Sequence, residues 1–589
     1  MSESSPGRPR FLRQFVRMVA TYWPIEEQWK AGGLIALLVA LTLGQIALQV
    51  RINTWSANLF DALEQHSTDK FLVQIGVLAA ILAAGMAITG AHLTIKRKIV
   101  LDWRRRLSRQ MLGDWMEAGH QFLVTHLPGE HDNPDGRIAE DIRNTTEVAL
   151  ELGHSLFYSL VLLGSFVKIL WDLSGPLSLA IGGAEVAIPG HMVWAALAYS
   201  SMATTLALLV GWPLIKAANQ RQAAEANFRF GLVRGRENAE AIALVHGEAD
   251  ERRRMLLSFA GVQAAWTGQT MALARLMIFS SGYSILSTGF PILISAPRYI
   301  AGAITLGILM QTAQAFQQCA AALSWPVDNL QRFAEWRASV DRVLALADAL
   351  DTLKTGTIRC VGCEIELTDS ERPALTFDAL DIATPAGQVV VEKFSAEIDQ
   401  GERVLIAGDP TAAIKLFKAV AGLWPWGAGR IGLPADASIF FMPERPYLPI
   451  EPLRAVLAYP SPPDTFDNIA LRGMLDRVGL YRLMGRLDAT ENWENTLPLA
   501  EQQLLGFARM LLHRPNWIFI EEATDALSAD RELEMMQLVF TELPAATVLT
   551  IGHHPALAAL HQRTLAPRDR RAEPRLQHGR RRDPRTPLA

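Results

Sequence analysis

The sequence predicts a polytopic α-helical membrane domain followed by an α/β domain. Three observations support this fold class. Half of the 589 residues are hydrophobic, and the mean hydropathy is positive. Six long apolar segments lie before residue 326. From about Ala374, short β-branched runs alternate with helical periods, as in a domain with a mainly parallel sheet.

The six apolar segments are each about 20 residues long, which is enough to cross a hydrocarbon layer of about 30 Å. A soluble protein would have to bury all six helices on every side. The predicted spans run roughly over Ala31–Val50, Phe71–Ile95, Leu152–Trp171, Trp194–Ile215, Met277–Ser295 and Ile300–Trp325. Residues 31–345 are therefore predicted to form a six-helix membrane domain.

The first 30 residues lack the apolar core and the small-residue cleavage site of a secretory signal. Their scattered arginines predict an amphipathic lead-in on the inner membrane face. Basic residues are dense after the second and fourth spans, whereas Asp172–Val193 has neither Lys nor Arg. Because basic loops stay in the cytoplasm, both termini are predicted to be cytoplasmic.

The α/β domain is predicted over residues 374–565, with the polar stretch 346–373 as a linker. Within that linker Cys360 and Cys363 form a C-x-x-C pair. Zinc sites use about four ligands, and no second Cys/His pair stands nearby in the sequence, so the two cysteines are interpreted as ordinary thiols.

Several ordered segments carry a family resemblance. They are "NPDGRIAEDIR" (133–143), "FRFGLVRGRENAEAIALVHGE" (228–248), "MQTAQAF" (310–316), "AVAGLWPWGAGRI" (419–431), "PERPYLP" (443–449) and "ARMLLHRPNWIFIEEATDAL" (508–527). With them the chain resembles a fused permease and ATPase half-transporter of the ABC superfamily. The branch is the bacterial one related to peroxisomal acyl-CoA transporters and to SbmA/BacA-like peptide and cobalamin transporters.

The resemblance implies an ABC exporter-type membrane domain, a nucleotide-binding domain that uses ATP and Mg²⁺, and a location in the bacterial inner membrane. It also implies a dimer with a second copy or a related half-transporter. The implied substrate is a peptide, a cobalamin-like compound or an acyl lipid-like molecule. No nucleic-acid partner is expected.

The nucleotide loop departs from the family pattern G-x-x-x-x-G-K-[ST]. It begins at Gly408, but Ala413 holds the place of the second glycine and Ile414 that of the lysine. Lys415 stands one place late, followed by Leu416 where Ser or Thr would hold magnesium. The missing lysine removes a charge-assisted contact worth about 1.5–3 kcal/mol. Gly408, Thr411 and Lys415 stay the candidate nucleotide contacts.

The strand "WIFIEE" is closer to the family pattern. By resemblance Glu521 replaces the magnesium-binding Asp, Glu522 matches the general base for the attacking water, and His553 matches the histidine that senses the γ-phosphate. These residues are interpreted as inherited site residues, either working or relics.

Two further positions depart from the pattern. Glu444 stands where a Gln usually contacts magnesium and the nucleophilic water. The signature appears as "LPLAEQQ", in which Pro498 and Ala500 replace Ser and Gly, while Glu501 and Gln502 remain as candidate contacts. Each family site combines the loop of one chain with the signature of the other, so a competent partner would not restore a normal site.

Other features point to the membrane domain and its loops. Gln311, Gln314 and Gln318 share one face of the last span and are predicted to line a substrate cavity or, alternatively, a helix contact. By resemblance the two cytoplasmic loops dock on the ATPase domain. The charges that could set this docking, or merely form solvated faces, are Glu140, Asp141, Arg143, Arg234, Arg236 and Glu237.

The Arg- and Pro-rich tail, residues 566–589, is predicted to be disordered. It is either a basic arm or a tail without function. Three functions follow for the whole chain: a transporter driven by weak ATP turnover, an ATP-independent carrier or membrane scaffold with a vestigial nucleotide-binding domain, or a decaying copy. Carboxylates are missing inside the spans apart from Asp172 near an external end, which weakens the case for proton coupling.

Overall fold

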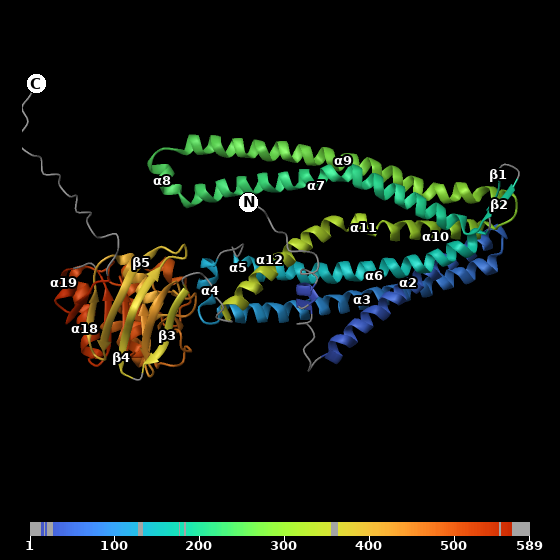
Figure 1. Cartoon of the computed structure of the whole chain (residues 1–589). Coiled ribbons are helices and arrows are strands. Elements are labelled where there is room, and N and C mark those ends of the chain that lie inside the picture. The colour runs from blue at the N-terminus through green and yellow to red at the C-terminus, as the bar shows by residue number, and fades with distance from the viewer. Residues whose placement is uncertain are drawn as a thin grey trace, which may run out of the picture. The chain divides into compact units, whose positions relative to one another are not determined.

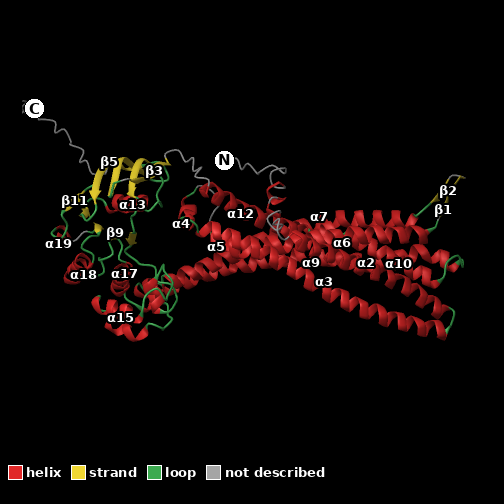
Figure 2. Cartoon of the chain, turned by 90° about the horizontal axis from the view of Figure 1, so that it is seen from below, coloured by secondary structure: helices red, strands yellow, loops and turns green. Residues whose placement is uncertain are grey.

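The computed structural model describes residues 13–16, 18–19, 28–127, 133–175, 177–181, 184–354, 363–370, 372–552 and 555–567. The chain divides into two compact units. The first comprises residues 1–113 and 132–347, and the second comprises residues 114–131 and 348–589. Figure 2 shows that the first is built almost entirely of helices, whereas the second also contains sheets.

Five helices of the first unit are long and apolar enough to cross a membrane. Their lengths, 33 to 53 residues, exceed the roughly 20 residues that a bilayer needs, so each extends beyond its apolar part. The five helices are α2 (Gln28–Glu64), α3 (Thr68–Met116), α6 (Ile142–Ser174), α7 (His191–Glu237) and α9 (Glu248–Ile300).

The sixth predicted span forms a shorter helix, α10 (Leu306–Leu323), which is not among those five. It begins after a turn rather than at Ile300, because the side chain of Thr305 caps it by accepting a hydrogen bond from the Ile308 N–H. Its Phe316 is fully buried. The helix packs against α2, α6, α7 and α9 and so forms the centre of the unit.

Short elements complete the first unit. A hairpin of β1 (Leu177–Ile181) and β2 (Ala184–Ile188) joins α6 to α7. Helices α7 and α9 lie side by side, and the short α8 (Ala239–Leu244) closes their far end (Figure 1). The remaining elements are α5 (Pro134–Gly136), the π-helical turn η3 (Arg137–Asp141), α11 (Trp325–Asp328) and α12 (Leu330–Lys354).

The second unit contains two sheets. The larger is wholly parallel, in the order β11-β6-β10-β9-β8, with strands Arg563–Leu565, Arg403–Ile406, Thr547–Ile551, Trp517–Glu521 and Ile439–Met442. The smaller is mixed, in the order β3-β7-β4-β5, with strands Cys363–Ser370, Gly427–Pro434, Ala374–Ala383 and Val389–Asp399.

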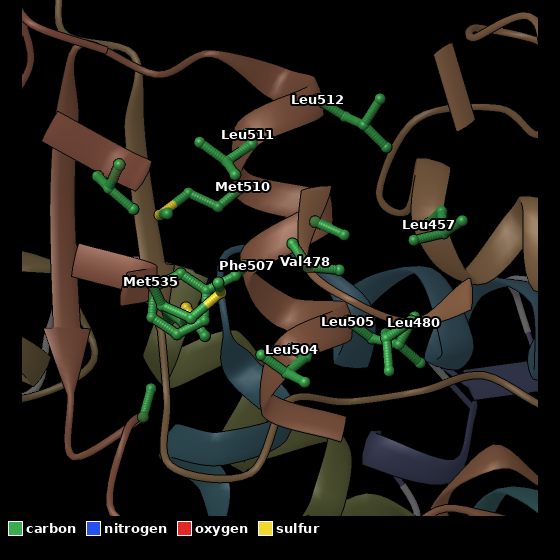
Figure 3. Packing of buried hydrophobic residues seen from close by; sticks show 14 of the residues in the cluster. Leu457, Val478, Leu480, Leu504, Leu505, Phe507, Met510, Leu511, Leu512 and Met535 are labelled. Atoms are coloured by element: carbon green, nitrogen blue, oxygen red, sulfur yellow. The ribbon is translucent and has the colours of Figure 1, made fainter. Parts of the chain in front are cut away.

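The helices described in the second unit are α4 (His120–Leu123), η2 (Val124–His126), α13 (Pro410–Val420), α14 (Leu453–Ala458), α15 (Asn468–Arg477), η4 (Tyr481–Arg486), α16 (Trp493–Thr496), α17 (Leu499–His513), α18 (Ala529–Glu542) and α19 (Pro555–Ala558). Helices α13 and α17 pack on strands of the parallel sheet, and α14, α15, α16 and α18 pack on α17. Figure 3 shows the core around α17, where Leu505, Phe507 and Met510 point at neighbouring elements that carry Leu480 and Met535. The α17 helix is therefore held by apolar burial on several sides.

Two sequence predictions need correction here. The expected linker contains strand β3, which pairs in parallel with β7. Its two apolar residues, Ile365 and Leu367, stand among polar neighbours, so the sequence pattern for a strand is weak. The predicted parallel sheet is present, but the smaller sheet is mostly antiparallel. The amphipathic lead-in, Cys360 and the tail from residue 568 lie mostly or wholly outside the described residues.

Candidate functional site

The candidate nucleotide site lies where strand β6 of the parallel sheet passes into helix α13. Gly408 has φ +115°, a backbone conformation that favours glycine. The helix already begins at Pro410, the first helical position, where proline's missing N–H costs nothing. Asp409 is its N-cap.

Asp409 takes up the amides at the start of α13. Its carboxylate Oδ1 accepts a hydrogen bond from the Thr411 N–H at 3.1 Å. Its carbonyl oxygen accepts from the N–H groups of Ala412 and Ala413, each at 3.1 Å. Both alanine side chains are buried. A carboxylate therefore occupies the position where a helix N-terminus would otherwise receive an anion.

The lysines of α13 point to other partners. Lys415 Nζ lies 5.6 Å from the centre of the Trp424 ring, a cation–π contact. Burial lowers the pKa of Lys415, partly offset by the nearby Asp409 and reinforced by Lys418. Lys418 in turn lies over the ring of Phe122 and is close enough to Glu521 to stabilise its carboxylate.

Three glutamates approach one another at the ends of strands β8 and β9. Burial raises the pKa of Glu521, Lys418 opposes this shift, and the like charges of Glu522 and Glu444 add to it. Glu522 has φ +47°, an uncommon conformation for a non-glycine residue, and its N–H donates to the Ile551 carbonyl at 3.0 Å. The described residues contain no group of three or more acidic, His or Cys side chains arranged to hold a metal ion.

The signature segment begins helix α17 at Pro498, which offers no side-chain cap. Glu501 forms an ion pair with Arg482, and Gln502 Nε2 donates to the carbonyls of Glu494 and Leu497, each at 2.8 Å. Both side chains predicted to contact a nucleotide are thus used within the domain.

The next residue was not singled out from the sequence. Gln503 is fully buried, and its Nε2 donates to the Glu444 carbonyl at 3.0 Å while its Oε1 accepts from the Ala526 N–H at 3.2 Å. Gln503 therefore ties α17 to the segments that follow strands β8 and β9. An uncharged polar residue within an apolar helix was the signal that could have identified it.

These residues do not fit a Mg²⁺-bound nucleoside triphosphate held in the usual way. The first N–H groups of α13 donate hydrogen bonds to Asp409, and the carboxylate of Asp409 adds a negative charge at the helix end that would face a phosphate. Lys415 contacts an indole ring, and Ile414 occupies the usual lysine position. The carboxyl of Glu521, the predicted magnesium ligand, is shifted towards its neutral form. His553 lies outside the described residues.

A second contact in this unit involves the segment that follows helix α3. The ring of His126 lies 5.5 Å from that of Trp426 and 5.7 Å from that of Trp424. Both tryptophans are buried. Lys354 at the end of α12 also forms an ion pair with Asp114. The loop after α3 thus packs on the α/β domain through aromatic rings.

The first unit contains a cavity of about 440 Å³ between α2, α3 and α6. Its lining combines apolar side chains with polar ones. The six polar lining residues are Gln45, Gln49, Thr89, His154, Ser155 and Tyr158. The cavity therefore offers hydrogen-bonding groups inside a helical unit that is mostly apolar.

The glutamines of α10 were predicted to line a substrate cavity or, alternatively, to form a helix contact. Gln311, Gln314 and Gln318 are not among the residues that line this particular cavity. Gln314 Nε2 donates to the Ser56 hydroxyl at 2.9 Å, and the backbone carbonyl of Gln311 accepts from Asn53 Nδ2 at 3.0 Å. These two join α10 to α2, which fits the alternative of a helix contact. Gln318 is half-buried one turn further along α10. The helix α10 as a whole packs against four other helices.

Comparisons with known proteins decide the family. Residues 22–300 match the family described as ABC transporter transmembrane region 2. An ABC transporter ATP-binding protein of Haemophilus influenzae is 30% identical over 564 residues, which cover 95% of this chain and 92% of the relative. The chain belongs to the ABC transporter family. It is a half-transporter that carries a transmembrane region and an ATPase-type domain in one polypeptide.

Two further comparisons cover nearly the whole chain. The inner membrane ABC transporter ATP-binding protein YddA of Escherichia coli is 28% identical over 552 residues, which cover 93% of this chain and 96% of YddA. The structure of a bacterial Atm1-family ABC exporter with ATP bound superposes with a TM-score of 0.68 at 16% identity, covering 92% and 94% of the two chains. This ABC half-transporter thus has the exporter fold predicted from its sequence.

Proposed function

We propose that this ABC transporter subunit moves a peptide, a cobalamin-like compound or an acyl lipid-like molecule across a bacterial inner membrane without hydrolysing ATP at its own loop site. The observation that carries the proposal is the Asp409 cap on α13. It places a carboxylate where phosphate would bind, and the two like charges repel each other.

The α/β domain then serves as a docking and dimerisation module. Its packing is intact, because Gln503 still joins three segments and α17 is buried on several sides. The loop after α3 still packs on Trp424 and Trp426. A second copy or a related half-transporter is the expected partner, and the proposed substrate classes come from the family resemblance alone.

The test uses the full chain reconstituted in lipid nanodiscs with Mg²⁺-ATP. We expect neither nucleotide binding nor an ATPase rate above that of Glu522→Gln. A rebuilt loop, Asp409→Ser with Pro410→Gly, Ala413→Gly, Ile414→Lys and Lys415→Ser, is expected to gain nucleotide binding. If the native chain hydrolyses ATP and Glu522→Gln abolishes that activity, the loop is a working site and the proposal is wrong.

A further inference from the structure

Two histidines from different helices meet beside the cavity of the first unit. His92 of α3 and His154 of α6 lie with their Nε2 atoms 2.8 Å apart and their ring centres 4.6 Å apart. They are 62 residues apart in the sequence, so no short sequence motif contains both of them. His92 is buried, with 8% of its surface exposed, and His154 also lines the cavity.

A third side chain, Thr42, favours one direction for the hydrogen bond between the rings. The Thr42 hydroxyl donates its only hydrogen to the Leu38 carbonyl at 2.7 Å. Its oxygen therefore accepts from His154 Nε2, which lies 3.1 Å away. With that donation from Thr42, His154 Nε2 carries the hydrogen and His92 Nε2 accepts in the short contact. Whichever ring donates, only one hydrogen fits between the two Nε2 atoms. The neutral pair has one hydrogen between the two Nε2 atoms.

This arrangement limits the pair to one additional proton. The first added proton binds the free Nδ1 of the ring that donates through Nε2, so that ring becomes charged. Its Nε2–H then donates to Nε2 of the neutral ring, which is a charge-assisted hydrogen bond. A second would charge both rings and put two N–H groups face to face across 2.8 Å. Hydrogen overlap and like-charge repulsion both oppose that state.

Charges of both signs lie near the pair: the cation Lys96 disfavours a charged ring, whereas the Glu151 carboxylate favours one. Lys96 of α3 lies 3.9 Å from Glu151 of α6, and Arg332 of α12 lies 3.5 Å from the same carboxylate. Glu151 is therefore shared by two cations, so one carboxylate stands against two nearby cations when the pair takes up a proton. Further polar groups near the pair are Thr42, Gln45 and Gln49 of α2, Thr89 of α3, and Ser155 and Tyr158 of α6.

We propose that His92 and His154 form a single-proton binding site on the wall of this cavity, so that the cavity gains one positive charge when the site is filled. The site supplies a titratable group inside the helical unit although carboxylates are scarce there. It does not depend on the proposed fate of ATP, because none of its residues belongs to the α/β domain. A filled site favours an anionic group in the cavity, and an empty one favours a neutral ligand.

Solid-state NMR of the full chain in lipid bilayers, with ¹⁵N- and ¹³C-labelled histidine, tests the site from neutral to acidic pH. We expect a coupling between two histidine Nε2 nuclei. One ring of that pair should become charged while the other stays neutral to the lowest pH. Both the coupling and the unusual titration should be lost in His92→Gln and in His154→Gln. In the latter, His92 should titrate as a single ring.

Controls separate the pair from ordinary histidines. His66→Gln and His246→Gln each remove an exposed ring and should leave the coupling unchanged. Thr42→Val keeps the shape of the side chain but removes the acceptor oxygen, so the pair's titration should shift while the coupling remains. Independent charging of both rings near the ordinary pKa of about 6.5, or no titration of either ring, would overturn the proposal.

Discussion

At the scale of single residues, Asp409 changes the meaning of the nucleotide loop more than the absent lysine does. A missing lysine weakens a phosphate contact, whereas a capping carboxylate occupies the contact's position. The dipeptide Asp409-Pro410 carries a strong signal for a helix start, with an acidic N-cap and proline at the first helical position. An alignment of residues 408–415 with the G-x-x-x-x-G-K-[ST] pattern does not indicate this helix start.

Removal of the cap should destabilise the α/β domain. We expect Asp409→Ala to cost about 1 kcal/mol of unfolding free energy, the usual effect of deleting an N-cap side chain. Asp467→Ala is the matched control, since Asp467 caps α15 through a 2.7 Å bond from the Ala470 N–H. Thermal unfolding of the purified chain measures both. A loss for Asp467→Ala alone would show that the Asp409 cap contributes nothing.

Glu521 gives a pH-dependent prediction. Its pKa is raised chiefly by burial, so the stability it contributes is fully present below its ordinary pKa and is lost as the pH rises through the higher native value. Well above that native value its charged carboxylate is therefore a burden, and Glu521→Gln should raise the unfolding midpoint by about 2 °C.

The advantage of Glu521→Gln should vanish below the ordinary pKa of a glutamate, where the native carboxyl is also neutral. Glu534→Gln is the control, because Glu534 is largely exposed and pairs with Arg531. It should raise the midpoint at neither pH. An advantage of Glu521→Gln that persists unchanged in acid would contradict the assignment of the shift to this carboxyl.

At the scale of elements, length and apolarity predicted six membrane spans. Five of them form helices long enough and apolar enough to cross a membrane, and the sixth forms the shorter α10, whose boundaries were not predicted. The local turn and the Thr305 cap set its start, and its glutamines set it apart from the other spans. Polar contacts between distant elements were not predictable either. Gln314 with Ser56 and His92 with His154 join residues 258 and 62 positions apart, and nothing local in the sequence specifies such pairs.

One such contact joins the turn before α6 to α12. Arg342 Nε and Nη2 donate to the two carboxylate oxygens of Asp141, at 2.9 and 2.5 Å, and Arg137 donates to the same carboxylate at 3.1 Å. Asp141 is 5% exposed and ends the π-helical turn η3. Among the loop charges singled out from the sequence, Asp141 therefore has an internal role.

Arg342→Met should cost about 1–2 kcal/mol, less than the loss of a fully buried ion pair because Arg137 remains and Arg342 is about one-third exposed. Faster amide hydrogen exchange over residues 133–147 should accompany the loss. Arg337→Met, which breaks the exposed 3.8 Å pair with Asp341, should cost less than about 0.5 kcal/mol. Equal effects of the two substitutions would exclude a special role for the Asp141 contact.

At the scale of the whole molecule, the membrane domain and the α/β domain followed from composition and periodicity, because bilayer thickness and strand pleating impose separate length and pattern rules. Composition and periodicity do not say whether each loop of the membrane domain packs on the α/β domain of its own chain or on that of a partner. The segment after α3 belongs to the same compact unit as the α/β domain and packs on it through His126 and the two tryptophans. The helix of the second loop, α8, belongs instead to the helical unit.

That difference predicts where a second copy binds. Leu244 at the end of α8 is 74% exposed and the adjoining Val245 is 77% exposed, although both are apolar and lie far from the predicted spans. By family resemblance such a loop helix docks on an ATPase-type domain, and we expect that domain to belong to the partner. Leu244→Asp should then weaken dimerisation at least about tenfold, since burying an unpaired carboxylate costs well over about 1.4 kcal/mol.

Mass photometry of the chain in detergent over a concentration series measures the dimer fraction. Ile469→Asp is the matched control, because Ile469 is 82% exposed on the α/β domain and its substitution should leave the dimer fraction unchanged. An unchanged dimer with Leu244→Asp would assign the interface to other surfaces of the half-transporter. A dimer lost with Leu244→Asp alone would mean that the second loop joins two chains, while the loop after α3 holds each chain's own α/β domain.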